Sequence, residues 1–214
     1  MSILPVIACL VIGYFLGCFQ TAYFMGKKFG KIDIRDFGSG NAGTTNVARV
    51  MGAKVGAVVF ITDVLKAVAA FIICSLLFGG GSIFFSGANG LLPGMLAGIG
   101  VTLGHNFPFF MKFKGGKGFA CSIGVILCTD WRVALVCFVL GFFGIFITKF
   151  MSVAALTVTG LFPICMLIFG HELASVLLSL FFTAMVFYQH KSNIKRLISG
   201  TENKFKIKKQ IEKK

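Results

Sequence analysis

Three polar segments of this sequence combine glycine, amide and basic side chains in patterns that suit an anionic ligand. The first covers residues 38–49 and reads GSGNAGTTNVAR. Its glycines allow backbone N–H groups to turn toward one point, as they do in phosphate-binding nests and at helix N-termini. A flexible loop that caps a following helix explains the composition equally well. The candidate phosphate ligands of this segment are Ser39, Gly40, Asn41, Thr45, Asn46 and Arg49.

The second segment covers residues 104–118 and reads GHNFPFFMKFKGGKG. Its glycine–lysine run lacks the spacing of a P-loop, because Gly118 rather than Ser or Thr follows Lys117. Nucleotide hydrolysis is therefore not predicted. Either a phosphate site or a simple basic anchor at a membrane boundary accounts for the lysines. The candidate ligands of this segment are His105, Lys114, Gly115, Gly116, Lys117 and Gly118.

The third segment covers residues 189–202, in which QHKSNIKRL is followed by GTE. His190 and Asn193 are three residues apart, so they share one face if this segment is helical. A histidine in such a position is more often a surface residue than a catalytic one. We nevertheless take His190 and Asn193 as candidates for contact with substrate.

These segments interrupt a chain with the composition of a membrane protein. Of 214 residues, 57% are hydrophobic and 13% are charged, whereas soluble domains carry about 25% charged residues. About 20 apolar residues are needed to cross a bilayer, so a run at 119–129 is short. We expect an all-α, polytopic transmembrane helix bundle with about seven spans, and five as the alternative. The apolar runs cover residues 3–25, 55–78, 91–110, 119–129, 133–148, 151–170 and 173–189.

Basic residues fall on alternate loops and predict the orientation in the membrane. Most of the 21 Lys and Arg residues lie in three stretches, at 26–54, 112–117 and 191–214. Basic loops stay in the cytoplasm, so we expect the amino terminus outside and the carboxyl tail inside. Topology and attraction to an anionic leaflet account for the net charge of +14. No nucleic-acid partner is therefore predicted.

We expect one integral-membrane domain over residues 1–214, with motif loops at 26–54, 104–118 and 189–202 and a basic tail at 203–214. All seven cysteines fall inside apolar runs without a Cys-x-x-Cys pair. They are therefore expected to be small apolar fillers rather than disulfide partners or metal ligands. Asp63 and Lys66 form an i, i+3 pair inside the second apolar run. Such a pair can be functional or can hold the bundle together.

Together and in this order, the three segments resemble the signature blocks of the acyl-phosphate-dependent glycerol-3-phosphate acyltransferases of bacterial membranes. The resemblance implies an enzyme that transfers a fatty acyl group from acyl phosphate to the sn-1 hydroxyl of glycerol 3-phosphate. The products are lysophosphatidic acid, the first intermediate of phospholipid biosynthesis, and phosphate. The resemblance also implies a multi-pass protein of the bacterial inner (plasma) membrane, with its active site at the cytoplasmic face. Its partners are expected to be glycerol 3-phosphate, acyl phosphate and the bilayer, and a monomer is the working expectation, although the sequence does not determine the oligomeric state. Neither cofactor nor metal ion is expected.

The resemblance assigns roles to individual residues. The family's phosphate- and substrate-binding positions fall on Ser39, Arg49, Lys117, His190 and Asn193, and we take Ser39, His190 and Asn193 as the catalytic candidates. Acyl phosphate is an activated mixed anhydride, so the reaction needs neither a covalent nucleophile nor a metal ion. The proton of the attacking hydroxyl can go to His190 or to the substrate's own phosphate. Further family positions with less defined roles are Asn41, Asn46 and His105.

An anion transporter or channel is the competing interpretation. It explains the apolar runs, the glycines and the basic loops. A transporter is expected to show paired repeats and binding groups near the middle of the bilayer. The sequence shows no internal repeat, and its polar motifs gather on the loops predicted to share one side. An acyltransferase is therefore favoured.

Overall fold

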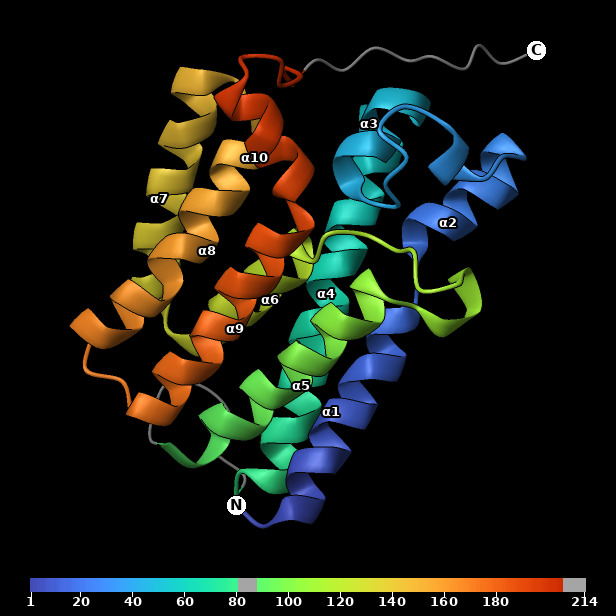
Figure 1. Ribbon diagram of the computed structural model, residues 1–214. Coiled ribbons are helices and arrows are strands. Elements are labelled where there is room, and N and C mark those ends of the chain that lie inside the picture. Colours follow the sequence, from blue (N-terminus) through green and yellow to red (C-terminus); the bar gives the residue numbers. More distant parts are fainter. Residues whose placement is uncertain (81–87, 206–214) are drawn as a thin grey trace.

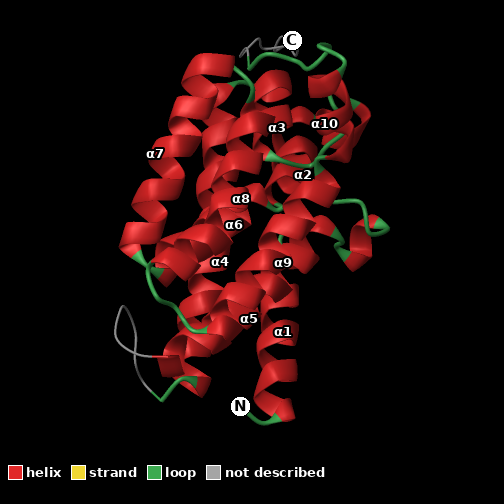
Figure 2. Cartoon of the chain, turned by 60° about the vertical axis from the view of Figure 1, so that its left-hand side comes forward, coloured by secondary structure: helices red, strands yellow, loops and turns green. Residues whose placement is uncertain are grey.

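The structure is a computed structural model of the 214-residue chain, and it describes residues 1–80 and 88–205. Throughout these residues the regular structure is helical, and the long helices lie side by side in one bundle (Figures 1 and 2). The bundle helices are α1 (Ile3–Cys18), α4 (Ala53–Phe78), α5 (Ala88–Asn106), α6 (Phe119–Thr129), α7 (Trp131–Thr148), α8 (Met151–Ile168) and α9 (Leu173–Gln189). Shorter helical elements are α2 (Thr21–Met25), η1 (Gly26–Gly30), η2 (Ile34–Asp36), α3 (Thr44–Met51), η3 (Phe109–Met111) and α10 (Lys191–Ile198).

Each apolar run predicted from the sequence corresponds to a bundle helix. The runs at 119–129 and 173–189 match α6 and α9 at both ends. The run at 3–25 divides into α1 and α2, with an extended residue, Phe19, between them. This agreement has a physical origin, because backbone groups in lipid must be satisfied internally and a helix does so within a single segment. The expectation of an all-helical polytopic membrane protein is confirmed.

The described residues contain fewer candidate membrane spans than the preferred estimate of seven. Within the described residues, four segments are long and apolar enough to cross a membrane: Ile3–Gly30, α4, α7 and α8. A fifth results if α9 and α10, which meet at a bend of 63°, count as one broken span. The alternative of five therefore agrees better. Helix α6 shows why, since 11 residues rise only about 16 Å, against about 30 Å of hydrocarbon.

Helices α1 and α5 pack with their backbones in contact. A side chain at any of four glycines would overlap the backbone of the opposite helix. The hydroxyl of Tyr14 in α1 donates a hydrogen bond of 2.9 Å to the carbonyl of Phe107, just beyond the end of α5. The start of the second polar segment is therefore held directly against α1. The four contact glycines are Gly13 and Gly17 of α1 and Gly100 and Gly104 of α5.

The cysteines lie where the sequence predicted them. All seven are buried and free, and most belong to the main apolar core between the bundle helices. The expectation that they act as small apolar fillers is confirmed.

The two ends of the bundle differ in character. At one end, the turn at Asp130 meets the turn after α8, where His171 Nε2 lies 3.0 Å from the Asp130 carboxylate. The opposite end carries the three polar segments. There the backbone N–H of Phe205 donates a 2.8 Å hydrogen bond to the carbonyl of Lys149, which fixes the last described residues beside the start of α8.

Candidate active site

The first polar segment is a tight loop that leads into α3. Gly38 and Gly40 have φ values of 61° and 72°, a region that favours glycine. The buried side chain of Asn46 holds the loop together: its Oδ1 accepts a 2.7 Å hydrogen bond from the backbone N–H of Ser39, and its Nδ2 donates to the carbonyls of Ile34 and Phe37. Asn46 thus shapes the loop, while Ser39 faces the site.

Helix α3 offers its amino terminus to the site. It begins at Thr44, and Gly43, Thr44 and Thr45 all line the cavity described below. The first N–H groups of a helix lack intrahelical acceptors and carry partial positive charge, so this end favours an anion. The prediction that this segment combines a helix terminus with small polar donors agrees with this arrangement.

The second polar segment folds back against the end of α5. The backbone N–H of Gly115 donates to the carbonyl of Asn106, and that of Gly116 donates to the carbonyl of His105, each at 3.0 Å. A Cβ at Gly116 would overlap the imidazole of His105. These two glycines therefore permit a close return of the chain, and they bring Lys117 to the site.

Hydrogen bonds join the first polar segment, and Arg35 just before it, to the second polar segment. Asn41 Nδ2 donates to the carbonyl of Gly115 at 3.4 Å. The guanidinium of Arg35 donates to the carbonyls of Met111 at 2.9 Å and Lys114 at 3.4 Å. Asp33 orients Arg35 through a 2.7 Å ion pair, and the hydrogen bond from Arg35 lowers the pKa of the Asp33 carboxyl. The sequence analysis did not select Arg35, because its role depends on a backbone carbonyl distant in the sequence.

The third polar segment begins where α9 bends into α10. His190 caps α9, and its Nδ1 lies 2.8 Å from the carbonyl of Val186. A carbonyl can only accept, so Nδ1 carries the proton and Nε2 keeps the lone pair. His190 is thus held in the tautomer whose Nε2 can accept a proton.

The three segments meet around one cavity of about 120 Å³. Nine of the predicted site residues line it: Ser39, Asn41, Thr45, Arg49, His105, Lys117, Gly118, His190 and Asn193. The other five do not line it. Gly40, Gly115 and Gly116 shape the turns, Asn46 holds the first loop, and Lys114 lies on the exposed surface. The apolar side chains on the lining, here called the apolar wall, are Phe60, Phe119, Ala120, Met151, Ala155 and Phe205.

Arg49 and Lys117 supply positive charge to the cavity. Within residues 1–80 and 88–205, Arg49 makes no hydrogen bond or ion pair, so its guanidinium is available to a ligand. Lys117 Nζ donates to Asn193 Oδ1. Burial lowers the pKa of Lys117 to about 8, and the nearby charge of Arg196 acts in the same direction while Glu202 opposes it. An incoming phosphate would restore the preference of Lys117 for its charged form.

A carboxylate also lies in this cationic site. Glu202 accepts hydrogen bonds from Asn193 Nδ2 at 2.6 Å, from Arg196 Nε at 2.7 Å and from Ser152 Oγ at 3.0 Å. Burial raises the pKa of Glu202, but these three hydrogen bonds outweigh burial and the net pKa is lowered. The sequence analysis missed Ser152, Arg196 and Glu202 as site residues. The GTE triplet after the third segment was the available signal for Glu202.

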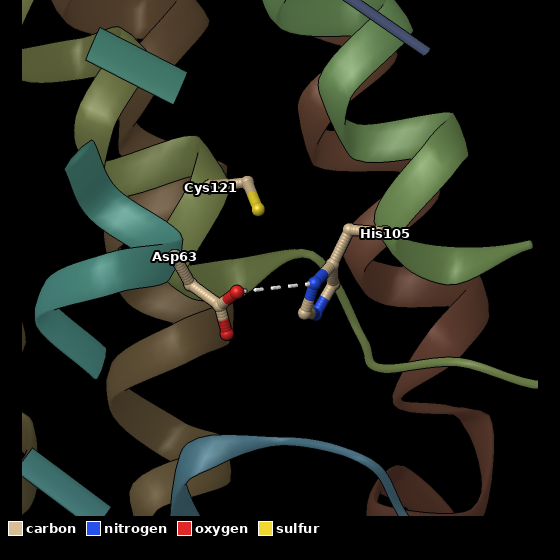
Figure 3. A group of neighbouring side chains, drawn as sticks. All are labelled: Asp63, His105 and Cys121. Carbon is tan, nitrogen blue, oxygen red and sulfur yellow. Dashed lines mark ion pairs between the residues drawn. The ribbon is translucent and has the colours of Figure 1, made fainter. Parts of the chain in front are cut away.

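Beneath the cavity lies a buried cluster of Asp63, His105 and Cys121, shown in Figure 3. Their potential ligand atoms lie within 4.8 Å of one another. Lys66 Nζ, however, is 2.8 Å from Asp63 Oδ1 and 3.0 Å from His105 Nδ1. This ammonium takes the position that a cation would need, so the cluster does not fit a metal ion. The predicted ion pair of Asp63 and Lys66 is present, and Asp63 also reaches the cavity.

Lys66 also ties the cluster to α1. It donates to the backbone carbonyls of Gly17 at 3.1 Å and Phe19 at 2.8 Å, at the break between α1 and α2. The buried amide of Gln20 donates to the carbonyl of His105 at 3.0 Å. The end of α1 thus supports α4 and α5, which supply Asp63 and His105 to the cavity.

Comparisons with known proteins agree with the geometry. The family model for glycerol-3-phosphate acyltransferase matches residues 7–200. The chain is 42% identical over 201 residues to the glycerol-3-phosphate acyltransferase of Thermoanaerobacter pseudethanolicus, which covers 94% of this chain and 96% of the relative. It is 40% identical over 210 residues to the enzyme of Clostridioides difficile, which covers 98% and 100%.

The fold is also shared with solved structures. The crystal structure of PlsY, an integral membrane glycerol 3-phosphate acyltransferase, in its glycerol 3-phosphate form superposes with a TM-score of 0.83 at 30% identity. The match covers 94% of this chain and 96% of PlsY. The lysophosphatidic acid form of PlsY matches with a TM-score of 0.81. These matches decide against the anion transporter or channel. The chain belongs to the glycerol-3-phosphate acyltransferase family and is an integral, multi-pass membrane enzyme.

Proposed function

We propose that this protein transfers a fatty acyl group from acyl phosphate to the sn-1 hydroxyl of glycerol 3-phosphate, which yields lysophosphatidic acid and phosphate. One observation carries the proposal: residues from three distant segments line a single cavity with a cationic side and an apolar wall. The PlsY structures in glycerol 3-phosphate and lysophosphatidic acid forms support this acceptor and this product.

The cationic side of the cavity suits the phosphate of glycerol 3-phosphate. Arg49 offers a planar fork for two phosphate oxygens, and Lys117 adds a second positive charge. Ser39 and the amino terminus of α3 provide neutral donors. Charge-assisted hydrogen bonds of this kind are about twice as strong as neutral ones.

The reaction needs positioning more than activation. The sn-1 hydroxyl oxygen attacks the carbonyl carbon of acyl phosphate and forms the ester bond. The bond between the carbonyl carbon and the phosphate oxygen then breaks, and phosphate leaves with the electron pair. The hydroxyl proton goes either to His190 Nε2 or to a phosphate oxygen of the substrate. Bringing the reacting atoms to about 3–3.5 Å contributes several kcal/mol, and fixed donors stabilise the oxyanion.

The apolar wall suits the acyl chain. Phe60, Met151 and Ala155 lie on the same cavity as the cationic residues, so a chain beginning at the carbonyl can leave the site across these side chains. Burial of methylene groups contributes about 0.8 kcal/mol each. An amphipathic donor is therefore favoured over a small soluble acyl group.

The proposed site lies at the cytoplasmic face. The basic stretches predicted to be cytoplasmic belong to the same segments that line the cavity, and cytoplasmic loops carry an excess of Lys and Arg. Labelling of single introduced cysteines in intact cells, in a variant whose seven native cysteines are replaced by Ala, tests this orientation. A cysteine at Lys195 should be protected from an impermeant reagent, whereas one at Glu172 should react. The opposite pattern would reverse the assignment.

The donor is tested by a direct comparison. Purified protein in lipid nanodiscs is supplied with glycerol 3-phosphate and with palmitoyl phosphate, palmitoyl-CoA or palmitoyl-acyl carrier protein in parallel. We expect lysophosphatidic acid and one equivalent of phosphate from palmitoyl phosphate. Turnover with only a thioester donor would overturn the assignment of acyl phosphate while leaving the acyltransferase family unaffected.

A further inference from the structure

We infer that Glu202, held by Ser152, is a positioning residue that orients the amide of Asn193 toward Lys117. The inference rests on the proposed function only in assigning Lys117 to the phosphate of the acceptor. A relay of hydrogen bonds runs from Ser152 in α8 to Glu202, from Glu202 to Asn193 in α10, and from Asn193 to Lys117.

The relay has a defined direction. A carboxylate can only accept, so the Asn193 group facing Glu202 must be the donor Nδ2, which lies 2.6 Å away. The other end of the amide, Oδ1, then accepts the hydrogen bond from Lys117. If the amide were flipped, Nδ2 would face the ammonium and Oδ1 would face the carboxylate. Glu202 therefore excludes the orientation that would leave Lys117 without an acceptor.

Glu202 is itself fixed on both sides. The backbone N–H of Thr201 donates to the carbonyl of Arg196 at 2.8 Å, and the N–H of Phe205 donates to the carbonyl of Lys149. Ser152, in the first turn of α8, donates to Glu202 Oε1 at 3.0 Å. Only 6% of the Glu202 side chain is exposed. The carboxylate is thus held in place before any substrate arrives.

Glu202 also acts on Lys117 through its charge. The negative charge opposes the burial and the Arg196 charge that lower the pKa of Lys117. Glu202 therefore keeps the ammonium protonated to a higher pH than the remaining surroundings would allow. The other charged or titratable groups on the cavity are Arg49 from α3, Asp63 from α4, His105 from α5, His190 from the bend, and Arg196 from α10.

The test combines Glu202→Gln with a pH profile, because a merely structural role would not move that profile. Wild-type protein and variant are compared in nanodiscs, by KM for glycerol 3-phosphate in turnover with palmitoyl phosphate. Loss of the Glu202 charge should lower the pH at which KM begins to rise by about one unit. At about pH 9, KM should then be about tenfold higher than in the wild type. An unchanged pH profile, even with a lower kcat, would overturn the inference.

Two further variants keep the test informative if Glu202→Gln does not fold. Ser152→Ala should shift the profile in the same direction by a smaller amount. Glu202→Asp keeps the charge and should retain the wild-type profile. Wild-type profiles for both Ser152→Ala and a folded Glu202→Gln would also contradict the inference. The matched control is Glu172→Gln, an exposed carboxylate at the other end of the bundle, which should change nothing.

A binding measurement separates this inference from the proposed donor. Calorimetric titration of glycerol 3-phosphate, without any acyl donor, should show the same loss of affinity at high pH in Glu202→Gln. If palmitoyl phosphate is not a donor but this binding shift occurs, the positioning role stands and the donor assignment fails. If turnover occurs and the binding shift is absent, the positioning role fails alone.

Discussion

Lys117 and Asn193 are 76 residues apart in the sequence, yet the ammonium of one donates a hydrogen bond to the amide oxygen of the other. This contact joins the glycine–lysine segment to the helix that follows the last membrane helix. It places the cation beside His190 and Glu202, both of which line the same cavity. The electrostatic state of the site therefore depends on a lysine whose pKa is lowered to about 8.

Binding of glycerol 3-phosphate should weaken at alkaline pH. Lys117 has a lowered pKa, so it is charged below about pH 8 and loses its charge as the pH rises through that value. We expect KM for glycerol 3-phosphate to be constant near neutral pH and to increase above about pH 8. Lys117→Arg should abolish this increase, because the guanidinium stays protonated. Persistence of the increase in the Arg variant would assign it to another group.

Arg49→Lys should be nearly as harmful as Arg49→Ala. Lysine keeps the charge but cannot reproduce the planar fork for two phosphate oxygens. We expect kcat/KM for glycerol 3-phosphate to fall about 30- to 1000-fold, which corresponds to about 2–4 kcal/mol for a desolvated charged contact. Thermal unfolding should be unchanged, since Arg49 makes no hydrogen bond or ion pair within the described residues. A Lys variant with full activity would remove Arg49 from the site.

His190→Ala separates two routes for the hydroxyl proton. If His190 Nε2 is the base, kcat should fall about 10²- to 10⁴-fold while KM for glycerol 3-phosphate changes little. If the phosphate of the substrate takes the proton, the variant should show mainly a KM effect. Steady-state kinetics at saturating palmitoyl phosphate distinguishes the two results.

Gly116→Ala should displace Lys117 and lower activity. The added Cβ would overlap the imidazole of His105, so the loop that carries Lys117 must shift. We expect a large loss of activity, of about 10²-fold for a displacement near 1 Å. Gly160→Ala is the matched control, because a Cβ there would make only ordinary contacts of 3.8 Å with Phe187 in the middle of a helix. That control should retain wild-type activity.

The pair of Asp63 and Lys66 should dominate the stability of the bundle near the site. Lys66→Met leaves a buried carboxylate without its ammonium and should cost about 3–5 kcal/mol. The double variant with Asp63→Asn should recover part of that loss. Unfolding in detergent, followed by circular dichroism, measures both. Additive losses from the two single changes would show that the pair does not act as a unit.

Sequence alone predicts the positions of the helices well, but it does not predict how many of them span the membrane. A long apolar run in lipid has few alternatives to a helix, so the limits of α6 and α9 follow from composition. Whether 11 apolar residues cross the bilayer depends on neighbouring helices that cover the polar ends. That information lies in tertiary packing, so the apolar runs alone do not distinguish seven spans from five.

The sequence likewise predicts some residues of the site and not others. Charge and glycine content mark the polar segments that carry Arg49 and Lys117, and the family resemblance then assigns these two residues to phosphate. The same reasoning cannot tell Asn41, which faces the cavity, from Asn46, which holds the loop. It also passes over Glu202, since an acidic residue is not expected among phosphate ligands. The place of Glu202 in the site becomes evident only from the three side chains that donate hydrogen bonds to it.

The glycine contact between α1 and α5 limits how this enzyme can change over evolutionary time. Gly104 lies one position before His105, so a larger side chain there would push α5 away from α1 and displace His105, which lines the cavity. The contact glycines, which do not touch the cavity, thereby fix the position of His105, which does. Variation in acyl-group preference among descendants of this chain is therefore expected at Met151 and Ala155, which line the same cavity from α8 and take no part in the α1–α5 contact.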